Sequence, residues 1–137
     1  MKKDRKILFV CWGNICRSPM AEYILKSLSN DIYCESRAVS DEESGNDIYP
    51  PAKRCLERHG IPYERHHARK ITQQDYEDFD EIYVMDELNR NRIRKLIDDH
   101  DHKIRMLNEE EIEDPWWTGR YDEVYDQIYE GILNILG

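Results

Sequence analysis

Residues 6–19 read Lys6-Ile7-Leu8-Phe9-Val10-Cys11-Trp12-Gly13-Asn14-Ile15-Cys16-Arg17-Ser18-Pro19. The stretch opens with an apolar run, Ile7 to Cys11, whose β-branched bias predicts a strand buried on both faces, as in a parallel sheet. Ser18 and Pro19 predict the start of a helix, because Ser is a favoured N-cap and Pro is tolerated at the first helical position. The residues between them must therefore form a tight loop from a buried strand to a helix N-terminus.

The rest of the chain alternates between strand-like and helix-like segments. Further strands are predicted at residues 31–37, within residues 79–85 and at residues 103–107. Further helices are predicted at residues 51–58, at residues 87–98 and near the C-terminus. Residues expected on their buried faces, and on that of the helix after Pro19, are Met20, Ile24, Leu25, Leu28, Leu88, Ile93, Leu96, Ile97, Val124, Ile128 and Ile132. This alternation predicts an α/β fold, a single domain over residues 1–137 with a parallel sheet and helices on both faces.

The composition indicates a compact domain with a very polar surface. Charged residues make up 36% of the 137 residues, and the mean hydropathy is -0.87. Apolar runs stay far below the roughly 20 residues that a membrane-spanning helix needs, and no signal-type stretch follows the N-terminus. The net charge of -9 argues against nucleic acid or an anionic membrane as a partner. We therefore expect a cytoplasmic protein that binds neither.

The chain has four cysteines, at positions 11, 16, 34 and 55. They form no Cys-x-x-Cys pair, and no paired Cys/His spacing of the zinc type is evident, so neither a metal nor another cofactor is expected. Cys34 and Cys55 are interpreted as small buried hydrophobic residues. Cys11 and Cys16 need a separate account because they lie in the loop.

The loop has the parts needed for phosphoryl transfer to sulfur. Its backbone N–H groups and the helix N-terminus can surround a tetrahedral anion, and the same field favours a thiolate at Cys11. Arg17 can grip two phosphate oxygens through its planar fork. Gly13 and Asn14 accept the left-handed backbone that a tight loop needs. Ser18 either donates a hydrogen bond to the thiolate or caps the helix.

A phosphate ester also needs an acid that protonates its leaving oxygen. Asp114 is the candidate, because Pro115 stiffens the chain beside it and two tryptophans follow. Trp116 and Trp117 could wall a cleft for an aromatic leaving group. Taken alone, the segment could also be a turn whose tryptophans cover the core.

The stretch from Cys11 to Glu22 resembles the signature of the low-molecular-weight protein tyrosine phosphatases. The likeness extends over nearly the whole chain, through these further pieces: Ser36, His59-Gly60-Ile61, Ala68-Arg69, Phe79-Asp80, Met85-Asp86 with Asn89, and Glu113-Asp114-Pro115. The resemblance implies a flavodoxin-like three-layer fold with a four-stranded parallel sheet. It also implies hydrolysis of phosphotyrosine in proteins and of small aryl phosphates, with phosphate or other oxyanions held in the active site.

The resemblance further implies a role for each site residue. Cys11 would form a phosphocysteine intermediate, Arg17 would bind the phosphate, and Asp114 would act as general acid and then as base. The residues implied to form the phosphate-binding loop are Trp12, Gly13, Asn14, Ile15, Cys16, Arg17 and Ser18. Those implied to support the loop are Asn14, Ser18, Ser36 and His66, with His67 as the less favoured alternative to His66. Cys16 would form a reversible disulfide with the nucleophile.

Three departures and three alternatives accompany this interpretation. Trp12 stands where a smaller aliphatic residue is common, so it is expected to join Trp116 and Trp117 in the substrate cleft and to make the rim of the pocket unusually aromatic. Residues 37–40 are a loose version of the family's small-residue stretch, and residues 107–113 are shorter than in many relatives. An arsenate reductase uses the same first loop but needs cysteines downstream, and none follows Cys55. A phosphoarginine phosphatase is expected to have Thr in place of Ile15. A phosphate-binding module without catalysis would have no use for the thiol or the acid.

Overall fold

The computed structural model describes residues 5–137. Its sheet has four strands, β1 (Lys6–Cys11), β2 (Tyr33–Ala38), β3 (Glu81–Val84) and β4 (Ile104–Met106). They pair in the order β2-β1-β3-β4, and every pairing is parallel. This is the flavodoxin-like order, so the predicted α/β fold with a four-stranded parallel sheet is confirmed.

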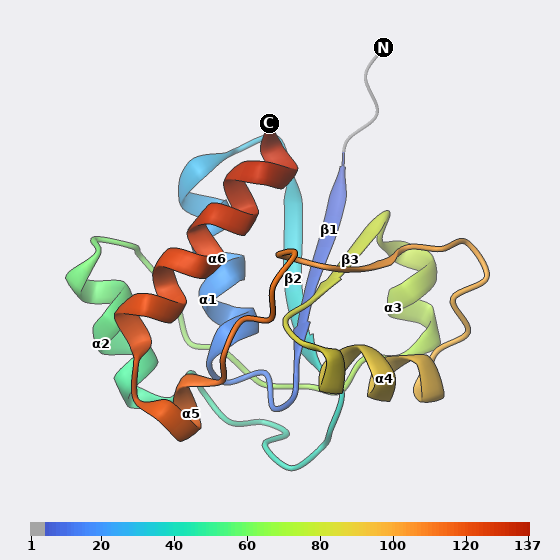
Figure 1. Ribbon diagram of the computed structural model, residues 1–137, viewed down its shortest axis with the longest axis horizontal. Coiled ribbons are helices and arrows are strands. Elements are labelled where there is room, and N and C mark those ends of the chain that lie inside the picture. Colours follow the sequence, from blue (N-terminus) through green and yellow to red (C-terminus); the bar gives the residue numbers. More distant parts are fainter. Residues whose placement is uncertain (1–4) are drawn as a thin grey trace.

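Within residues 5–137, six helices accompany the sheet (Figure 1). They are α1 (Arg17–Leu28), α2 (Pro50–Arg58), α3 (Gln73–Asp78), α4 (Glu87–Leu96), α5 (Pro115–Thr118) and α6 (Tyr121–Leu136). Apolar side chains of α1, α2 and α6 pack on one face of the sheet, and those of α3 and α4 pack on the other. The three-layer arrangement follows from this division. No helix in the described part of the chain is both long and apolar enough to cross a membrane.

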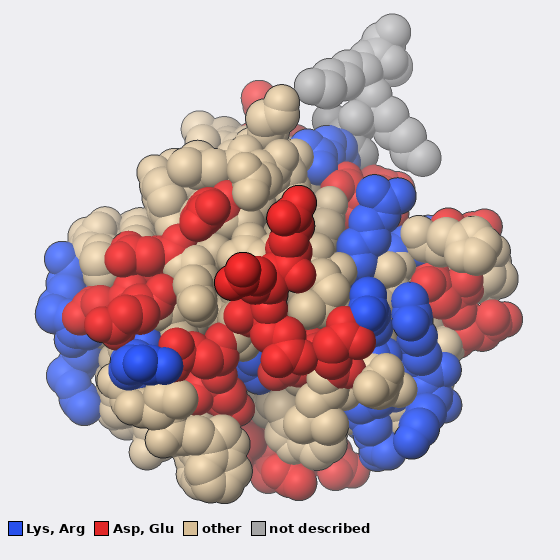
Figure 2. Space-filling model, in the orientation of Figure 1, with Lys and Arg blue, Asp and Glu red and all other residues tan. Residues whose placement is uncertain are grey.

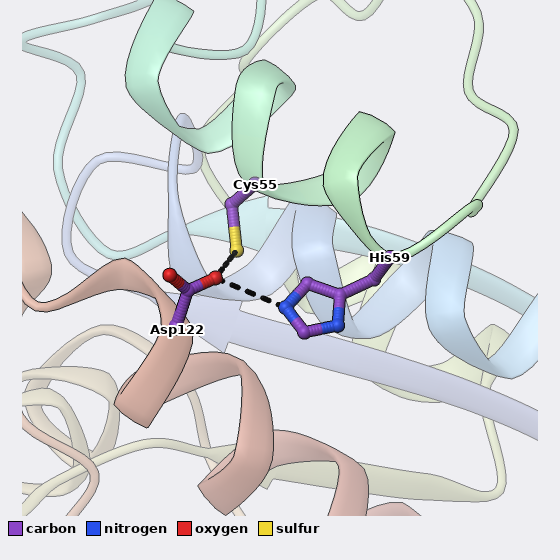
Figure 3. A group of neighbouring side chains, drawn as sticks. All are labelled: Cys55, His59 and Asp122. Carbon is purple, nitrogen blue, oxygen red and sulfur yellow. Dashed lines mark hydrogen bonds and ion pairs between the residues drawn. The ribbon is translucent and has the colours of Figure 1, made fainter.

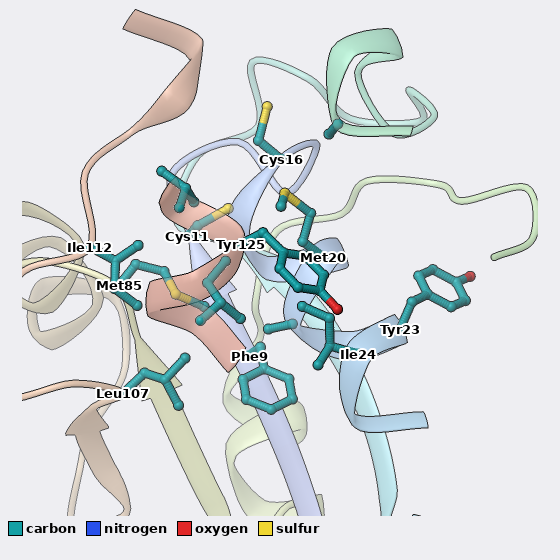
Figure 4. Packing of buried hydrophobic residues seen from close by; sticks show 14 of the residues in the cluster. Phe9, Cys11, Cys16, Met20, Tyr23, Ile24, Met85, Leu107, Ile112 and Tyr125 are labelled. Carbon is teal, nitrogen blue, oxygen red and sulfur yellow. The ribbon is translucent and has the colours of Figure 1, made fainter. Parts of the chain in front are cut away.

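Strand β1 lies inside the sheet and is buried on both faces, as predicted. Ile7 and Phe9 join the cluster beneath α1 and α6, whereas Leu8 and Val10 join the cluster beneath α3 and α4. Figure 4 shows Phe9 and Cys11 among the side chains of the first cluster. The chain leaves β1 for α1 at the carboxyl end of the sheet, where neighbouring strands separate and ligands bind in open α/β sheets.

Two short helices escaped the sequence prediction, although the first has a local signal. Helix α3 begins with a capping box, in which the Thr72 side chain accepts from Asp75 N and the Asp75 side chain accepts from Thr72 N. The Thr-x-x-Asp pattern could have indicated it. Helix α5 has only four residues, too few for any hydrophobic periodicity.

Some predicted details were wrong. Leu88 was expected inside but is 63% exposed, because it lies in the first turn of α4, where it faces a surface cavity instead of the core. Helix α4 ends at Leu96, two residues early, and Leu28 at the end of α1 is also exposed. Ser18 does not cap α1, since the N-cap residue is Cys16. The Ser18 hydroxyl lies beside Cys11.

Candidate active site

Cys11 is the last residue of β1, and its sulfur lies inside the loop that follows. Asn14 N donates to Sγ at 3.3 Å and Ser18 N donates at 3.4 Å, while Ser18 Oγ lies 3.0 Å away. The loop therefore directs hydrogen-bond donors at the sulfur. This is the arrangement expected around a thiolate that receives an anion.

Asn14 is the residue that bends the loop. Its φ is +60°, in the left-handed region, whereas Gly13 has a negative φ, so only one of the two predicted residues takes that conformation. The Asn14 side chain is fully buried, and its Nδ2 donates to Ser18 Oγ at 2.8 Å and to Ser36 Oγ at 2.9 Å. Its Oδ1 accepts from Arg69 N at 3.2 Å. A costly backbone conformation is thus held by several side-chain hydrogen bonds.

His66 is the histidine of this network. Its Nε2 lies 2.8 Å from the Asn14 carbonyl oxygen and 3.2 Å from Asn14 Oδ1, both of which are acceptors. Nε2 must therefore carry a proton and donate. His67 is exposed, so the structure brings His66 and not His67 to the loop.

The network extends to Glu22, which sequence reasoning did not single out. Ser36 Oγ donates to Glu22 Oε1 at 2.7 Å, and Glu22 pairs with Lys26 one turn later on α1. The Ser36 hydroxyl thus accepts a hydrogen bond from Asn14 and donates one to the buried carboxylate of Glu22. The only sequence signal was a glutamate four residues before a lysine, and the same spacing is common on helix surfaces.

Arg17 is buried beneath the loop, with its guanidinium fixed by partners far along the chain. Its Nη1 donates to Asp86 Oδ2 at 2.8 Å and to the Ile112 carbonyl at 2.7 Å. Its Nη2 lies 3.7 Å from Asp114 Oδ2. Burial opposes the charge, but the negative groups of Cys11, Asp86 and Asp114 outweigh it and raise the pKa of Arg17. Arg17 is therefore a permanent cation at the base of the site.

Asp114 lies opposite the loop as the N-cap of α5. Its Oδ1 accepts from Trp116 N at 3.1 Å, and Pro115 occupies the first helical position. The side chain is 29% exposed, enough to reach a bound molecule. Trp116 and Trp117 follow at once and are strongly exposed, with their rings perpendicular and centroids 4.6 Å apart.

These groups surround one cavity of about 680 Å³. Its walls are built from the Cys11 loop, the acidic turn after β2, the start of α4 and α5. The lining residues are Cys11, Trp12, Gly13, Ile15, Cys16, Arg17, Glu42, Glu43, Asp86, Leu88, Asn89, Asp114, Trp116 and Trp117. The predicted nucleophile, arginine, acid and tryptophans therefore meet in one place.

Several wall residues were not predicted from the sequence. Asp86 caps α4 by accepting from Asn89 N at 2.7 Å, and it also anchors Arg17. The Asn89 side chain is fully buried, and both its amide atoms lack partners among the described residues. Glu42 accepts from the Trp12 indole, which holds that ring at the rim.

The surroundings of the cavity are acidic, in keeping with the net charge. Figure 2 shows acidic side chains gathered across the middle of the molecule and basic ones over α4. Glu109, Glu110 and Glu111 lie exposed on the segment between β4 and α5. The positive potential needed for an anion is therefore confined to Arg17 and the loop amides.

Cys16 lies in the same loop but in a different environment. Its sulfur points toward the Tyr121 hydroxyl at 4.0 Å. Burial, reinforced by Cys11, raises the pKa of the Cys16 thiol well above its ordinary range. Cys16 is therefore a neutral thiol, poorly suited to nucleophilic attack.

Comparison with known proteins identifies the family of this chain. Residues 6–136 match the family model described as low molecular weight phosphotyrosine protein phosphatase. The chain belongs to this family. It is 35% identical over 144 residues to the low molecular weight protein-tyrosine-phosphatase YfkJ of Bacillus subtilis, an alignment that covers 95% of this chain and 92% of the relative.

Solved structures give the same result. The low molecular weight protein tyrosine phosphatase SP-PTP of Streptococcus pyogenes superposes with a TM-score of 0.92 at 37% identity, covering 96% of this chain and 91% of that one. The tyrosine phosphatase Wzb of Escherichia coli K30, in complex with sulphate, gives 0.88 at 25% identity, covering 98% and 100%. The family and the enzyme class predicted from the sequence, a low-molecular-weight protein-tyrosine-phosphatase, are therefore confirmed.

The Asn14 network yields a stability prediction. Asn14→Gly keeps the left-handed backbone but removes the side-chain hydrogen bonds, and we expect it to lower the free energy of unfolding by about 2 kcal/mol or more. Asn14→Ala should lose about 1 kcal/mol further, because alanine tolerates that backbone poorly. Urea denaturation of both variants measures the difference. Equal stability of the alanine and glycine variants would contradict the account of loop strain.

Proposed function

We propose that this protein hydrolyses phosphotyrosine in proteins, and small aryl phosphates, through a phosphocysteine intermediate on Cys11. The observation that carries the proposal is the meeting of Cys11, Arg17 and Asp114 around one cavity. The first two lie at opposite ends of a loop whose amides can surround an anion, and Asp114 lines the same cavity with its Oδ2 3.7 Å from Arg17 Nη2.

In the first step the Cys11 thiolate attacks phosphorus. A P–S bond forms as the P–O bond to the phenolic oxygen breaks, and Asp114 gives its proton to that oxygen. Arg17 binds the phosphate oxygens through Nε and Nη2, because Nη1 is already engaged by Asp86 and Ile112. The loop amides stabilise the charge that accumulates on the equatorial oxygens.

In the second step Asp114, now a carboxylate, takes a proton from water. The resulting hydroxide attacks phosphorus, the P–S bond breaks, and the Cys11 thiolate is released together with inorganic phosphate. Ser18 Oγ, 3.0 Å from the sulfur, is placed to donate to the thiolate as it leaves. Every group in both steps belongs to this chain, so the proposed chemistry needs no metal or cofactor.

The rim of the cavity is suited to an aromatic substrate. Trp12, Trp116 and Trp117 provide flat apolar surfaces, and Leu88 adds an exposed aliphatic wall. A phenolic ring can stack there while its phosphate reaches Cys11 at the base. We propose that Asn14, Ser18, Ser36 and His66 act by holding the loop in shape for that phosphate.

The reactivity of Cys11 bears on the compartment in which the protein acts and on the role of Cys16. A nucleophilic thiolate is lost on oxidation, so we propose that the protein acts in the reducing environment of the cytoplasm. Cys16 lies in the same short loop as Cys11. When a peroxide oxidises Cys11 to a sulfenic acid, the Cys16 thiol would, as the family resemblance implies, condense with it, releasing water and forming a reversible disulfide that protects the nucleophile.

The role of Asp114 predicts a dependence on the leaving group. Asp114→Asn cannot donate a proton, so kcat/KM for phenyl phosphate, a poor leaving group, should fall by about 10² to 10⁴-fold. The ratio kcat/KM reports on the first step alone, whereas kcat also includes the second step, in which Asp114 acts as base for every substrate. The loss for p-nitrophenyl phosphate should be much smaller, because its phenolate leaves without protonation. Steady-state and single-turnover kinetics measure both. Glu113→Gln is the matched control, since Glu113 pairs with Arg120, and it should change neither rate by more than a few-fold.

Equal losses for the two substrates would show that Asp114 is not the acid. A similar leaving-group dependence in Glu113→Gln would show that the role of general acid had been assigned to the wrong carboxylate.

The choice between phosphotyrosine and phosphoarginine is a separate prediction. Ile15 and the three tryptophans favour a flat phenolic ring, so kcat/KM should be at least tenfold higher for phosphotyrosine than for phosphoarginine in peptides of matched sequence. Release of phosphate from the two peptides measures the ratio. A clear preference for phosphoarginine would overturn the substrate assignment and leave the two-step mechanism intact.

A further inference from the structure

A second cluster of reactive side chains lies where α2 meets α6, apart from the catalytic cavity (Figure 3). Cys55 is fully buried on α2, His59 follows four residues later at the end of that helix, and Asp122 lies in the first turn of α6. Asp122 Oδ1 is 3.6 Å from Cys55 Sγ and 3.0 Å from His59 Nε2. All three ligand atoms lie within 4.8 Å of one another.

These separations suit three corners of a tetrahedral metal site. With Zn–S near 2.3 Å and Zn–N and Zn–O near 2.1 Å, tetrahedral angles place sulfur about 3.6 Å from oxygen and nitrogen about 3.4 Å from oxygen. The observed sulfur–oxygen distance equals the first value, and the nitrogen–oxygen distance needs only a small opening. One thiolate, one imidazole and one carboxylate are also ligand types that zinc accepts.

We propose that Cys55, His59 and Asp122 form a Zn²⁺ site that clamps α2 to α6, with a water molecule as fourth ligand. On binding, the Cys55 thiol gives its proton to solvent and coordinates as thiolate. The proposal is independent of the function proposed above, because none of the three residues lines the catalytic cavity.

The surroundings of the cluster support a rigid site. The His59 ring stacks on Tyr125, with centroids 3.7 Å apart and planes 10° from parallel, so its orientation is fixed before a metal arrives. Both helices are anchored to the core by neighbouring buried residues, including Leu56 and Val124. A metal would therefore meet ligands that need little rearrangement.

A simpler reading is that Asp122 only cross-links the helices through hydrogen bonds. Arg58 Nη2 lies 3.1 Å from the same Oδ1 and competes for it. Arg58 and Asp122 are both strongly exposed, so this ion pair is weak and Arg58 can swing into solvent and leave Oδ1 to the metal. Arg58 and a metal ion therefore compete for Asp122, and the affinity of the site for the metal can be measured.

The sequence did not predict this cluster, because its third residue, Asp122, lies far along the chain from Cys55 and His59. The spacing Cys55-x-x-x-His59 places both side chains on one side of a helix, but two ligands do not define a site. Asp122 joins them only through the packing of α6 against α2. The expectation that the chain holds no metal is therefore revised by this proposal.

Binding at this site would also bear on the loop that holds Cys11. Tyr121 precedes Asp122; its carbonyl accepts from Cys55 Sγ at 3.5 Å and its hydroxyl lies 4.0 Å from Cys16 Sγ. A metal that fixes Asp122 would fix Tyr121 against the loop. The clamp is thus expected to raise the thermal stability of the whole domain.

Titration with Co²⁺, a spectroscopic substitute for Zn²⁺, tests the proposal. The metal-free, reduced protein should bind one Co²⁺ with a thiolate-to-metal charge-transfer band and the intense visible bands of a four-coordinate site, and Zn²⁺ should displace it. Asp122→Asn and His59→Gln should each weaken binding at least tenfold. Asp126→Asn, with the same charge change one turn along α6, should bind as the parent does.

Two cysteine variants locate the metal. Cys11→Ser should keep the charge-transfer band, and Cys55→Ser should lose it. Circular dichroism establishes that each variant is folded, and Asp122→Asn remains informative if Cys55→Ser does not fold. The proposal is overturned if the parent shows no charge-transfer band, if the band disappears in Cys11→Ser, or if Asp126→Asn weakens binding as much as Asp122→Asn does.

Discussion

The hydrogen bonds of the Asn14 side chain hold the catalytic loop in a shape that its backbone would not adopt alone. A non-glycine residue at φ +60° is costly, and here the cost is offset by bonds to Ser18, Ser36 and the chain at Arg69. These partners come from α1, β2 and the segment before Lys70, which pairs with the end of β2. The loop geometry therefore depends on the packing of the whole sheet, and loss of that packing would disperse the site.

The same loop provides local positive potential in a protein whose net charge is negative. A chain with a net charge of -9 repels anions at long range, and the cavity rim adds Glu42 and Glu43. Attraction must act at short range, through amides directed at the Cys11 sulfur and through the buried cation of Arg17. Asp86 orients that cation. The tryptophans add apolar surface at the rim of the cavity, and there we propose that the ester group is selected.

Local sequence was sufficient to predict the parts of the site that one segment builds. The β-branched run into Cys11 predicts the buried strand, and the six-residue step to Arg17 predicts the anion loop. Asp114 could be chosen as the candidate acid because proline and two tryptophans follow it, and the structure brings it into the cavity. The fold class followed from the alternation of strands and helices, while α5 was too short to leave a periodic signal.

Contacts between distant segments of the chain could not be predicted from the sequence. Asp86 and the Ile112 carbonyl anchor Arg17 from 69 and 95 residues away, and Glu22 receives a bond from Ser36 across the α1–β2 interface. The exposure of Leu88 likewise depends on how α4 meets the cavity, which periodicity alone does not determine. Each of these is set by tertiary packing, whereas His66 was already favoured over His67 by the family resemblance and is the histidine that the structure brings to the loop.

The most direct test of the account is to identify the phosphorylated residue during turnover. Protein mixed with excess p-nitrophenyl phosphate is quenched in acid within milliseconds, digested and mapped by mass spectrometry, with Cys11→Ser as the control. The account predicts a phosphoryl group on the peptide that contains Cys11 and on Cys11 itself, formed in a burst of about one equivalent of p-nitrophenol and absent from the control. Turnover with no phosphoenzyme trapped at any quench time, or a phosphoryl group on another residue, would contradict it.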